Sequence, residues 1–158
     1  MARLWGTGFE WQLTTAGVEF GTKTGSPTID TTIKHGGAAS MRCNPSAAAW
    51  NMAHNFRADT IADAYVSVWI YIATEPSATT SILVYGDSTS FWGAKVRLNN
   101  DRTLTLNQSD NSSPYNGTTV LTKNVWHQIE LYFNETTDKG TVRLNGVEEI
   151  AANTVADI

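Results

Sequence analysis

The chain has 158 residues and a formal net charge of −4, with 11 Lys and Arg against 15 Asp and Glu. Its basic residues are scattered singly, which argues against nucleic acid and anionic membrane as partners, because phosphate binding needs clustered Lys and Arg. No run approaches the roughly 20 apolar residues of a membrane-spanning helix, and the single cysteine, Cys43, excludes an internal disulfide and a thiolate metal cluster.

The length suits one domain, and we expect residues 1–158 to form a single one. Residues 1–6 have no apolar core of signal-peptide length, so we expect synthesis in a cytosol. Charged residues make up 16% of the chain, below the usual share of about a quarter, and Thr, Ser and Asn take up the difference. This composition indicates a neutral, hydrogen-bonding surface.

Eight strands with a weaker sequence signal are predicted where β-branched and aromatic residues lie between turn residues. They cover residues 39–44, 50–56, 80–85, 92–99, 102–107, 118–121, 140–144 and 147–151. Three turn signals separate the later strands, and Asn-Gly favours the primed hairpin turns that match strand twist. These signals are Asn99-Asn100-Asp101, Asp138-Lys139-Gly140 and Asn145-Gly146.

The clearest strand is predicted over residues 64–73, where side chains alternate strictly between two faces. One face carries the aliphatic residues Val66, Val68, Ile70 and Ile72. The opposite face carries Tyr65, Ser67, Trp69 and Tyr71. Pro76 follows and cannot continue a ladder of hydrogen bonds, so the strand ends before it.

A second strong strand is predicted over residues 125–133 by the same alternation. Its inward residues are Ile129, Leu131 and Phe133, and its outward residues are Gln128, Glu130 and Tyr132. Ten or more short strands separated by turns indicate an all-β antiparallel sandwich or barrel.

Three segments carry a resemblance to a known superfamily. They are Gly8-Phe9-Glu10, residues 35–42 (HGGAASMR), and residues 126–132 (WHQIELY) followed by 142–146 (VRLNG). In order and spacing they resemble jelly-roll domains of the concanavalin A-like lectin/glucanase superfamily, including laminin-G-like domains and carbohydrate-binding modules. The resemblance spans residues 9–150 and implies an all-β, antiparallel two-sheet jelly-roll sandwich.

The resemblance also implies a structural calcium ion held by Glu10 with backbone oxygens near His35 and Gly37, and no other cofactor is expected. Members of this superfamily continue into a final strand with an acidic pair, whereas this chain stops at residues 155–158. We therefore expect the final strand to be missing or supplied by a partner, because an unpaired sheet edge invites strand addition. The start at residues 1–5 resembles that of proteins encoded in bacteriophage genomes, where such folds serve as head decorations or tail receptor-binding parts.

Catalysis is not expected, because a glycosidase needs two carboxyl groups on one face of a cleft. Glu135 falls beyond the strand that carries Glu130, and the neighbours Glu148 and Glu149 point to opposite faces. The three histidines, in separate segments, have neither zinc-ligand spacing nor a nucleophile elbow beside them.

The aromatic residues are the candidate binding site. Tyr65, Trp69 and Tyr71 face away from the aliphatic row of their strand, and Tyr85 and Trp92 flank a loop and form a candidate rim. Exposed rings of this kind stack on sugars or bury at protein interfaces. Whether Trp69 belongs to the core or to the contact surface stays open at this point.

These observations predict a non-catalytic structural or adhesion protein of a virion, a lectin-like head decoration or tail-associated part. It would act through protein–protein contacts, with other virion proteins or its own copies, or through glycans. The alternative is a stand-alone carbohydrate-binding module, and the least favoured function is a glycoside hydrolase. Neither nucleic acid nor membrane is expected as a partner.

Overall fold

The computed structural model describes residues 22–24, 27–43, 52–54, 63–85, 94–107, 114–134 and 136–154. In these ranges every regular element is a β-strand, and no helix occurs. The chain divides into two compact units, Met1–Phe56 and Arg57–Ile158, each of which is described by itself. The expectation of a single domain over residues 1–158 stays a prediction.

The described residues of the N-terminal unit form two short antiparallel pairs of strands. β1 (Thr22–Thr24) pairs with β4 (Met52–His54), and β2 (Thr28–Asp30) pairs with β3 (Ser40–Arg42). Asp30 ends β2, because its Oδ1 accepts hydrogen bonds of 2.8 Å from the backbone N–H groups of Thr32 and Ile33. Those two bonds, led by that from Ile33, lower the pKa of the Asp30 carboxyl. The sequence predicted β3 and β4 but neither β1 nor β2.

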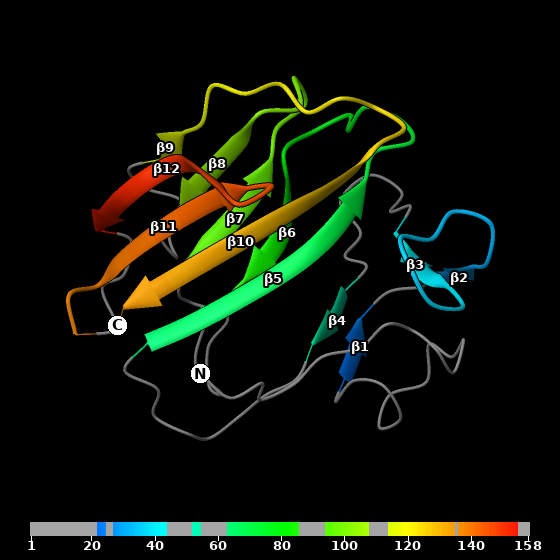
Figure 1. Ribbon diagram of the computed structural model, residues 1–158, viewed down its shortest axis with the longest axis horizontal. Coiled ribbons are helices and arrows are strands. Elements are labelled where there is room, and N and C mark those ends of the chain that lie inside the picture. The colour runs from blue at the N-terminus through cyan, green and yellow to red at the C-terminus, as the bar shows by residue number, and fades with distance from the viewer. Residues whose placement is uncertain are drawn as a thin grey trace. The chain divides into compact units, whose positions relative to one another are not determined.

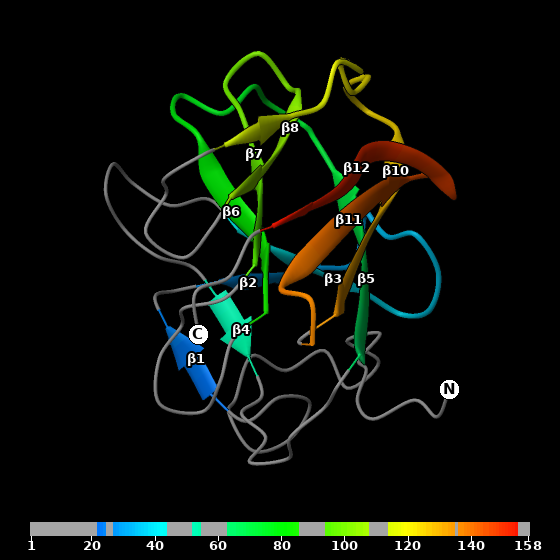
Figure 2. The same cartoon turned by 90° about the vertical axis from the view of Figure 1, so that its left-hand side faces the viewer.

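The C-terminal unit is a sandwich of two four-stranded antiparallel sheets (Figures 1 and 2). The first sheet has the order β12-β11-β10-β5, and the second has the order β6-β7-β8-β9. Their bounds are β5 (Asp63–Tyr71), β6 (Thr80–Val84), β7 (Lys95–Leu98), β8 (Leu104–Asn107), β9 (Tyr115–Asn116), β10 (Trp126–Asn134), β11 (Lys139–Leu144) and β12 (Val147–Thr154). The predicted all-β antiparallel two-sheet sandwich is confirmed.

The core lies between these two sheets and consists mainly of aliphatic side chains with Phe133. Ile129, Leu131 and Phe133 of β10 are 0% exposed, as predicted from their alternation. From the second sheet, Val96, Leu104 and Leu106 are equally buried and belong to the same cluster. Burial stabilises each such side chain by about 1.5–3 kcal/mol, so these strands hold the two sheets together.

The turns predicted at residues 99–101 and 145–146 form where expected, whereas the third lies at residues 136–138, because Lys139 and Gly140 already belong to β11. Asn145 and Gly146 both have positive φ, 52° and 81°, and join β11 to β12. This pair of left-handed residues is the requirement of a type I′ turn. Asp138 also has a positive φ, 53°, just before β11.

The strand predicted over residues 118–121 is wrong. The Glu149 carboxylate of β12 accepts hydrogen bonds from the backbone N–H groups of Thr118 (2.6 Å) and Thr119 (2.8 Å) and from the Thr119 hydroxyl (2.7 Å). These amides therefore bond to a side chain instead of a ladder, and the short pair to β8 is made by β9 upstream. The composition of this segment favours a strand, but the Glu149 carboxylate binds the N–H groups that a strand would need for pairing.

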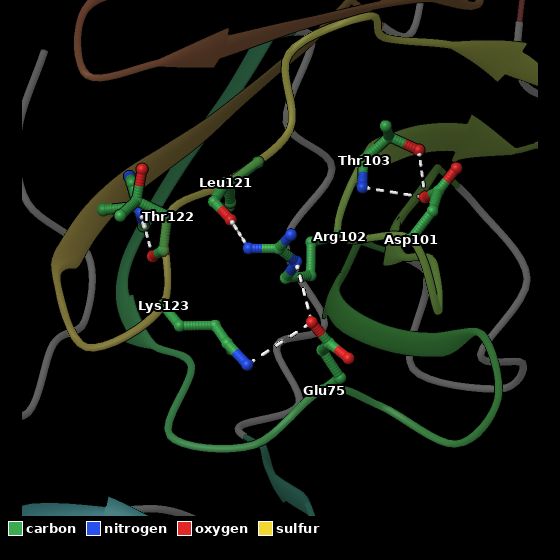
Figure 3. Close-up of polar contacts among 8 residues, drawn as sticks. Glu75, Asp101, Arg102, Thr103, Leu121, Thr122 and Lys123 are labelled. Atoms are coloured by element: carbon green, nitrogen blue, oxygen red, sulfur yellow. Dashed lines mark hydrogen bonds and ion pairs between the residues drawn. The ribbon is translucent and has the colours of Figure 1, made fainter.

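Glu75, between β5 and β6, links two other connections at one end of the sandwich (Figure 3). Its Oε1 lies 3.5 Å from Nε of Arg102 and 3.4 Å from Nζ of Lys123. Arg102 in turn donates from Nη1 to the Leu121 carbonyl oxygen at 3.0 Å. Each exposed ion pair contributes little alone, so the link acts mainly by setting the path of the loops.

The contact between Gly117 and Glu149 generates a stability prediction. A Cβ added at Gly117 would lie 2.5 Å from Oε1 and 2.9 Å from Cγ of Glu149, so Gly117→Ala must push the carboxylate off its amides. We expect the free energy of unfolding to fall by about 1–2 kcal/mol. This is the usual contribution of hydrogen bonds that an exposed, charged group makes. Urea unfolding at neutral pH measures it.

Glu149→Gln is the matched variant, and its loss should not add to that of Gly117→Ala, because both changes disrupt one contact. Burial raises the pKa of Glu149, but the hydrogen bonds from Thr119 and Thr118 outweigh it and leave the pKa lowered from 4.5. The carboxylate's contribution is therefore present above pH 4.5 and is lost as the pH falls through the folded value. Losses in the free energy of unfolding that add in the double variant would contradict this contact. A difference in that free energy between wild type and Glu149→Gln that persists in acid would also contradict it.

Candidate functional site

The outward side of β5 and β10 is a single surface of rings and polar groups, which we call the aromatic face. Register places its members opposite one another in four cross-strand pairs: Tyr71 with Trp126, Trp69 with Gln128, Ser67 with Glu130, and Tyr65 with Tyr132. Three of its rings are large and exposed, at 43% for Tyr65, 41% for Trp69 and 37% for Tyr132. Exposed aromatic groups gathered on one surface are typical of a contact site.

Two tyrosines of the aromatic face are held by reciprocal diagonal hydrogen bonds. The Tyr65 hydroxyl of β5 donates to Oε1 of Glu130 on β10. The Tyr132 hydroxyl of β10 donates to Oδ1 of Asp63 on β5 at 2.7 Å, and the Asn134 amide donates to the same oxygen at 2.5 Å. Each ring is thus tied at its far end to the neighbouring strand, which fixes its orientation before any ligand arrives.

A second pair of rings lies at the other end of the aromatic face. The ring centroids of Tyr71 and Trp126 lie 5.4 Å apart with their planes tilted by 54°. This geometry is favourable for neighbouring aromatic rings. Both residues are half-buried, so they support the surface more than they present it.

A charged row crosses the sheet beside the tyrosines. Cross-strand pairing joins Glu130 to Arg143 of β11 and Arg143 to Glu148 of β12. Glu130 is only 9% exposed, and its Oε1 also lies 3.4 Å from the Gln128 amide nitrogen. Among the described residues, Arg143 forms no ion pair with either carboxylate, although it lies between them in the row.

A hollow of about 280 Å³ opens between the tyrosines and this row. Its lining residues are Tyr65, Tyr132, Thr141, Arg143 and Glu148. It combines two tyrosine rings and their hydroxyls with one guanidinium, one carboxylate and the hydroxyl of Thr141. Such a site can bind a small polar molecule through stacking and directed hydrogen bonds, the usual design of a ligand site.

The structure brings together three of the residues singled out from the sequence and places a fourth elsewhere. Tyr65, Trp69 and Tyr71 share the aromatic face, and the exposure of Trp69 answers the question whether it is a core residue. Tyr85 is half-buried, and its ring packs 5.2 Å from that of the core residue Phe133, so it does not contribute to this face. Trp92 lies outside the described residues.

Sequence reasoning did not assign Arg143 or Glu148 to the site. Both follow from the register of the consecutive strands β10, β11 and β12, and the pairing of β11 with β12 contains register shifts that alternation alone cannot show. For Tyr132 a signal existed, since the alternation over residues 125–133 predicted it outward. Its hydroxyl's partner, Asp63, belongs to a strand more than sixty residues earlier and could not be identified that way.

The calcium prediction stays a prediction, because Glu10 lies outside the described residues. Within the described ranges, no group of three or more His, Cys, Asp or Glu side chains could hold a metal ion. The same part of the chain contains no helix long and apolar enough to cross a membrane.

Comparison with protein families, with curated proteins and with solved structures found no match to this chain. The resemblance to concanavalin A-like jelly rolls and to bacteriophage proteins therefore remains a prediction from the sequence.

The hydrogen bond between Tyr65 and Glu130 generates a titration prediction. Desolvation first, and then the hydrogen bond and charge of Glu130, raise the pKa of Tyr65 from 10.0 to about 12. The phenol is favoured in its neutral form, so its contribution to stability is complete below pH 10 and is lost as the pH rises toward 12. Ultraviolet titration should show a late-titrating tyrosine whose signal disappears in Tyr65→Phe.

Glu130→Gln is the companion variant and should bring the Tyr65 titration toward its ordinary value, because the acceptor loses its charge. Tyr71→Phe serves as the control and should leave the late phenol in place. Loss of the late titration in Tyr71→Phe, or its persistence in Tyr65→Phe, would contradict the assignment.

Proposed function

We propose that this chain is a non-catalytic, lectin-like binding domain that contacts glycans through the aromatic face. The observation that carries the proposal is the exposure of Tyr65, Trp69 and Tyr132 on one side of one sheet, with hydrogen-bonding groups between them. The two tyrosines are held in place by carboxylates, so little conformational freedom is lost on binding.

The chemistry of the face favours a carbohydrate over other ligands. A sugar ring has apolar C–H faces that pack on aromatic rings and hydroxyl groups that need directed hydrogen-bond partners. The face supplies both, with ring surfaces at Trp69 and Tyr65 and polar groups at Gln128 and Ser67, which bond to each other at 3.1 Å. A nucleic acid whose bases stack on these rings is disfavoured, because the chain's net charge of −4 repels phosphates.

Hydrolysis is the competing function, because Glu130 and Glu148 share one row of the sheet. Two strand spacings separate them, which puts their backbones about 9.6 Å apart. Inverting glycosidases hold their carboxyl groups roughly 6.5–9.5 Å apart, so distance alone does not decide. Arg143 occupies the register position between the two, where a glycosidase needs the scissile bond and its water. Binding without cleavage is therefore the proposal.

We propose a virion as the setting, as a head decoration or a tail-associated adhesion part. The phage-like start at residues 1–5 is its support. A stand-alone carbohydrate-binding module is the alternative, and it would use the same face. The competing proposal is that the aromatic face is a protein–protein interface, with copies of the chain or with other virion proteins.

Trp69→Ala tests the proposal on a glycan array and, for each glycan bound, by titration calorimetry. We expect wild type to bind and the variant to lose at least about tenfold in affinity, equivalent to about 1.4 kcal/mol. Val120→Ala is the control, since Val120 is 51% exposed but lies between β9 and β10, outside the aromatic face. Intact glycan should be recovered after incubation.

Four results would count against the proposal. Absence of any glycan binding by wild type removes it. Equal losses in the two variants would place binding outside the aromatic face. Cleavage of a bound glycan that stops in Glu148→Gln would establish the hydrolase instead. Sedimentation of wild type as an oligomer that Trp69→Ala dissociates would assign the face to assembly.

A further inference from the structure

Arg143 is the cation of the hollow and is not used by the fold's own ion pairs. Its side chain is exposed, and among the described residues no carboxylate forms an ion pair with it. Its neighbour Glu130 already accepts a hydrogen bond from the Tyr65 hydroxyl, and its carboxylate lies beside the Gln128 side-chain amide. The guanidinium is therefore available to a ligand, with five N–H donors in a planar fork.

We propose that the hollow binds a terminal sugar that carries one carboxylate, a sialic or uronic acid, and that Arg143 binds this carboxylate. The inference rests on the proposed glycan-binding function and names its ligand class. A guanidinium matches a carboxylate by two parallel hydrogen bonds, which are stronger and more selective than bonds to neutral hydroxyls.

The remaining lining residues restrict which acidic ligand fits. Glu148 lies on the far side of Arg143 and accepts hydrogen bonds from ligand hydroxyl or N–H groups, but it repels a second negative charge. Glu130, which pairs with Arg143 across the sheet, adds to that repulsion. The hollow thus suits a ligand with a single anionic group and several donors, and it disfavours polysulfated chains.

The volume of the hollow suits an acidic part of one sugar ring. At about 280 Å³ it lies just below the usual range of ligand pockets, which begins at about 300 Å³. Trp69 lies four residues from Tyr65 along β5, or roughly 13 Å at the rise of a strand. A chain that ends in the hollow would place its following sugars over Trp69, which unites both parts of the face.

The experiment compares pairs of glycans that differ only in the terminal acidic sugar. Wild type should bind the acid-terminated member at least about tenfold more tightly. Arg143→Gln should bind both members with about equal affinity. Arg143→Lys should retain part of the preference, since it keeps the charge and loses the fork. Heparin is included as a polysulfated probe and should bind more weakly than the acid-terminated glycan.

Lys139→Gln is the matched control, because it removes one positive charge from the same strand outside the hollow. It should keep the full preference, and circular dichroism confirms that each variant is folded. Equal binding of both members of each pair by wild type overturns the acidic-sugar inference while leaving glycan binding intact. A preference that survives in Arg143→Gln, or that Lys139→Gln abolishes equally, also overturns it. Failure to bind any glycan removes the proposed function itself.

Discussion

The antiparallel pairing of β5 with β10 is the constraint on which the rest of the C-terminal unit depends. Nine residues of each strand pair without a break, from Trp126 with Tyr71 to Asn134 with Asp63. Because side chains alternate, this single register sends one set of side chains into the core and the other to the outward surface. A slip of one residue would bury Glu130 in the core and expose Phe133, so the core and the aromatic face are set together.

The same register explains why exposed rings can be tolerated and used. Tyr65 and Tyr132 are directly opposite, and each hydroxyl reaches a carboxylate one row away on the other's strand. The rings are therefore held upright instead of collapsing onto the sheet, and a hollow remains between them and Arg143. A surface that is fixed in this way loses little side-chain entropy on binding, which favours recognition of a small polar ligand.

Much of this arrangement was predictable from local pattern, and the rest was not. Period-two alternation identified β5 and β10 and the direction of Trp69, because each strand has one apolar side. The Asn145-Gly146 turn was predictable because few dipeptides suit two successive left-handed residues. The segment at 118–121 was misassigned since its amides bond to Glu149, a residue about thirty positions later. The row from Glu130 through Arg143 to Glu148 depends on a pairing of β11 with β12 that contains register shifts, which no local pattern encodes.

The central claim is that ligand recognition takes place on the outward side of the sheet formed by β5, β10, β11 and β12. Two-dimensional NMR of the ¹⁵N-labelled protein during titration with an acid-terminated oligosaccharide tests it most directly. The account predicts that the indole signal of Trp69, the guanidinium signal of Arg143 and the amides of β5, β10 and β11 shift in a saturable manner. Saturable shifts confined to the β6–β9 sheet or to the N-terminal unit, with these signals unmoved, would contradict it.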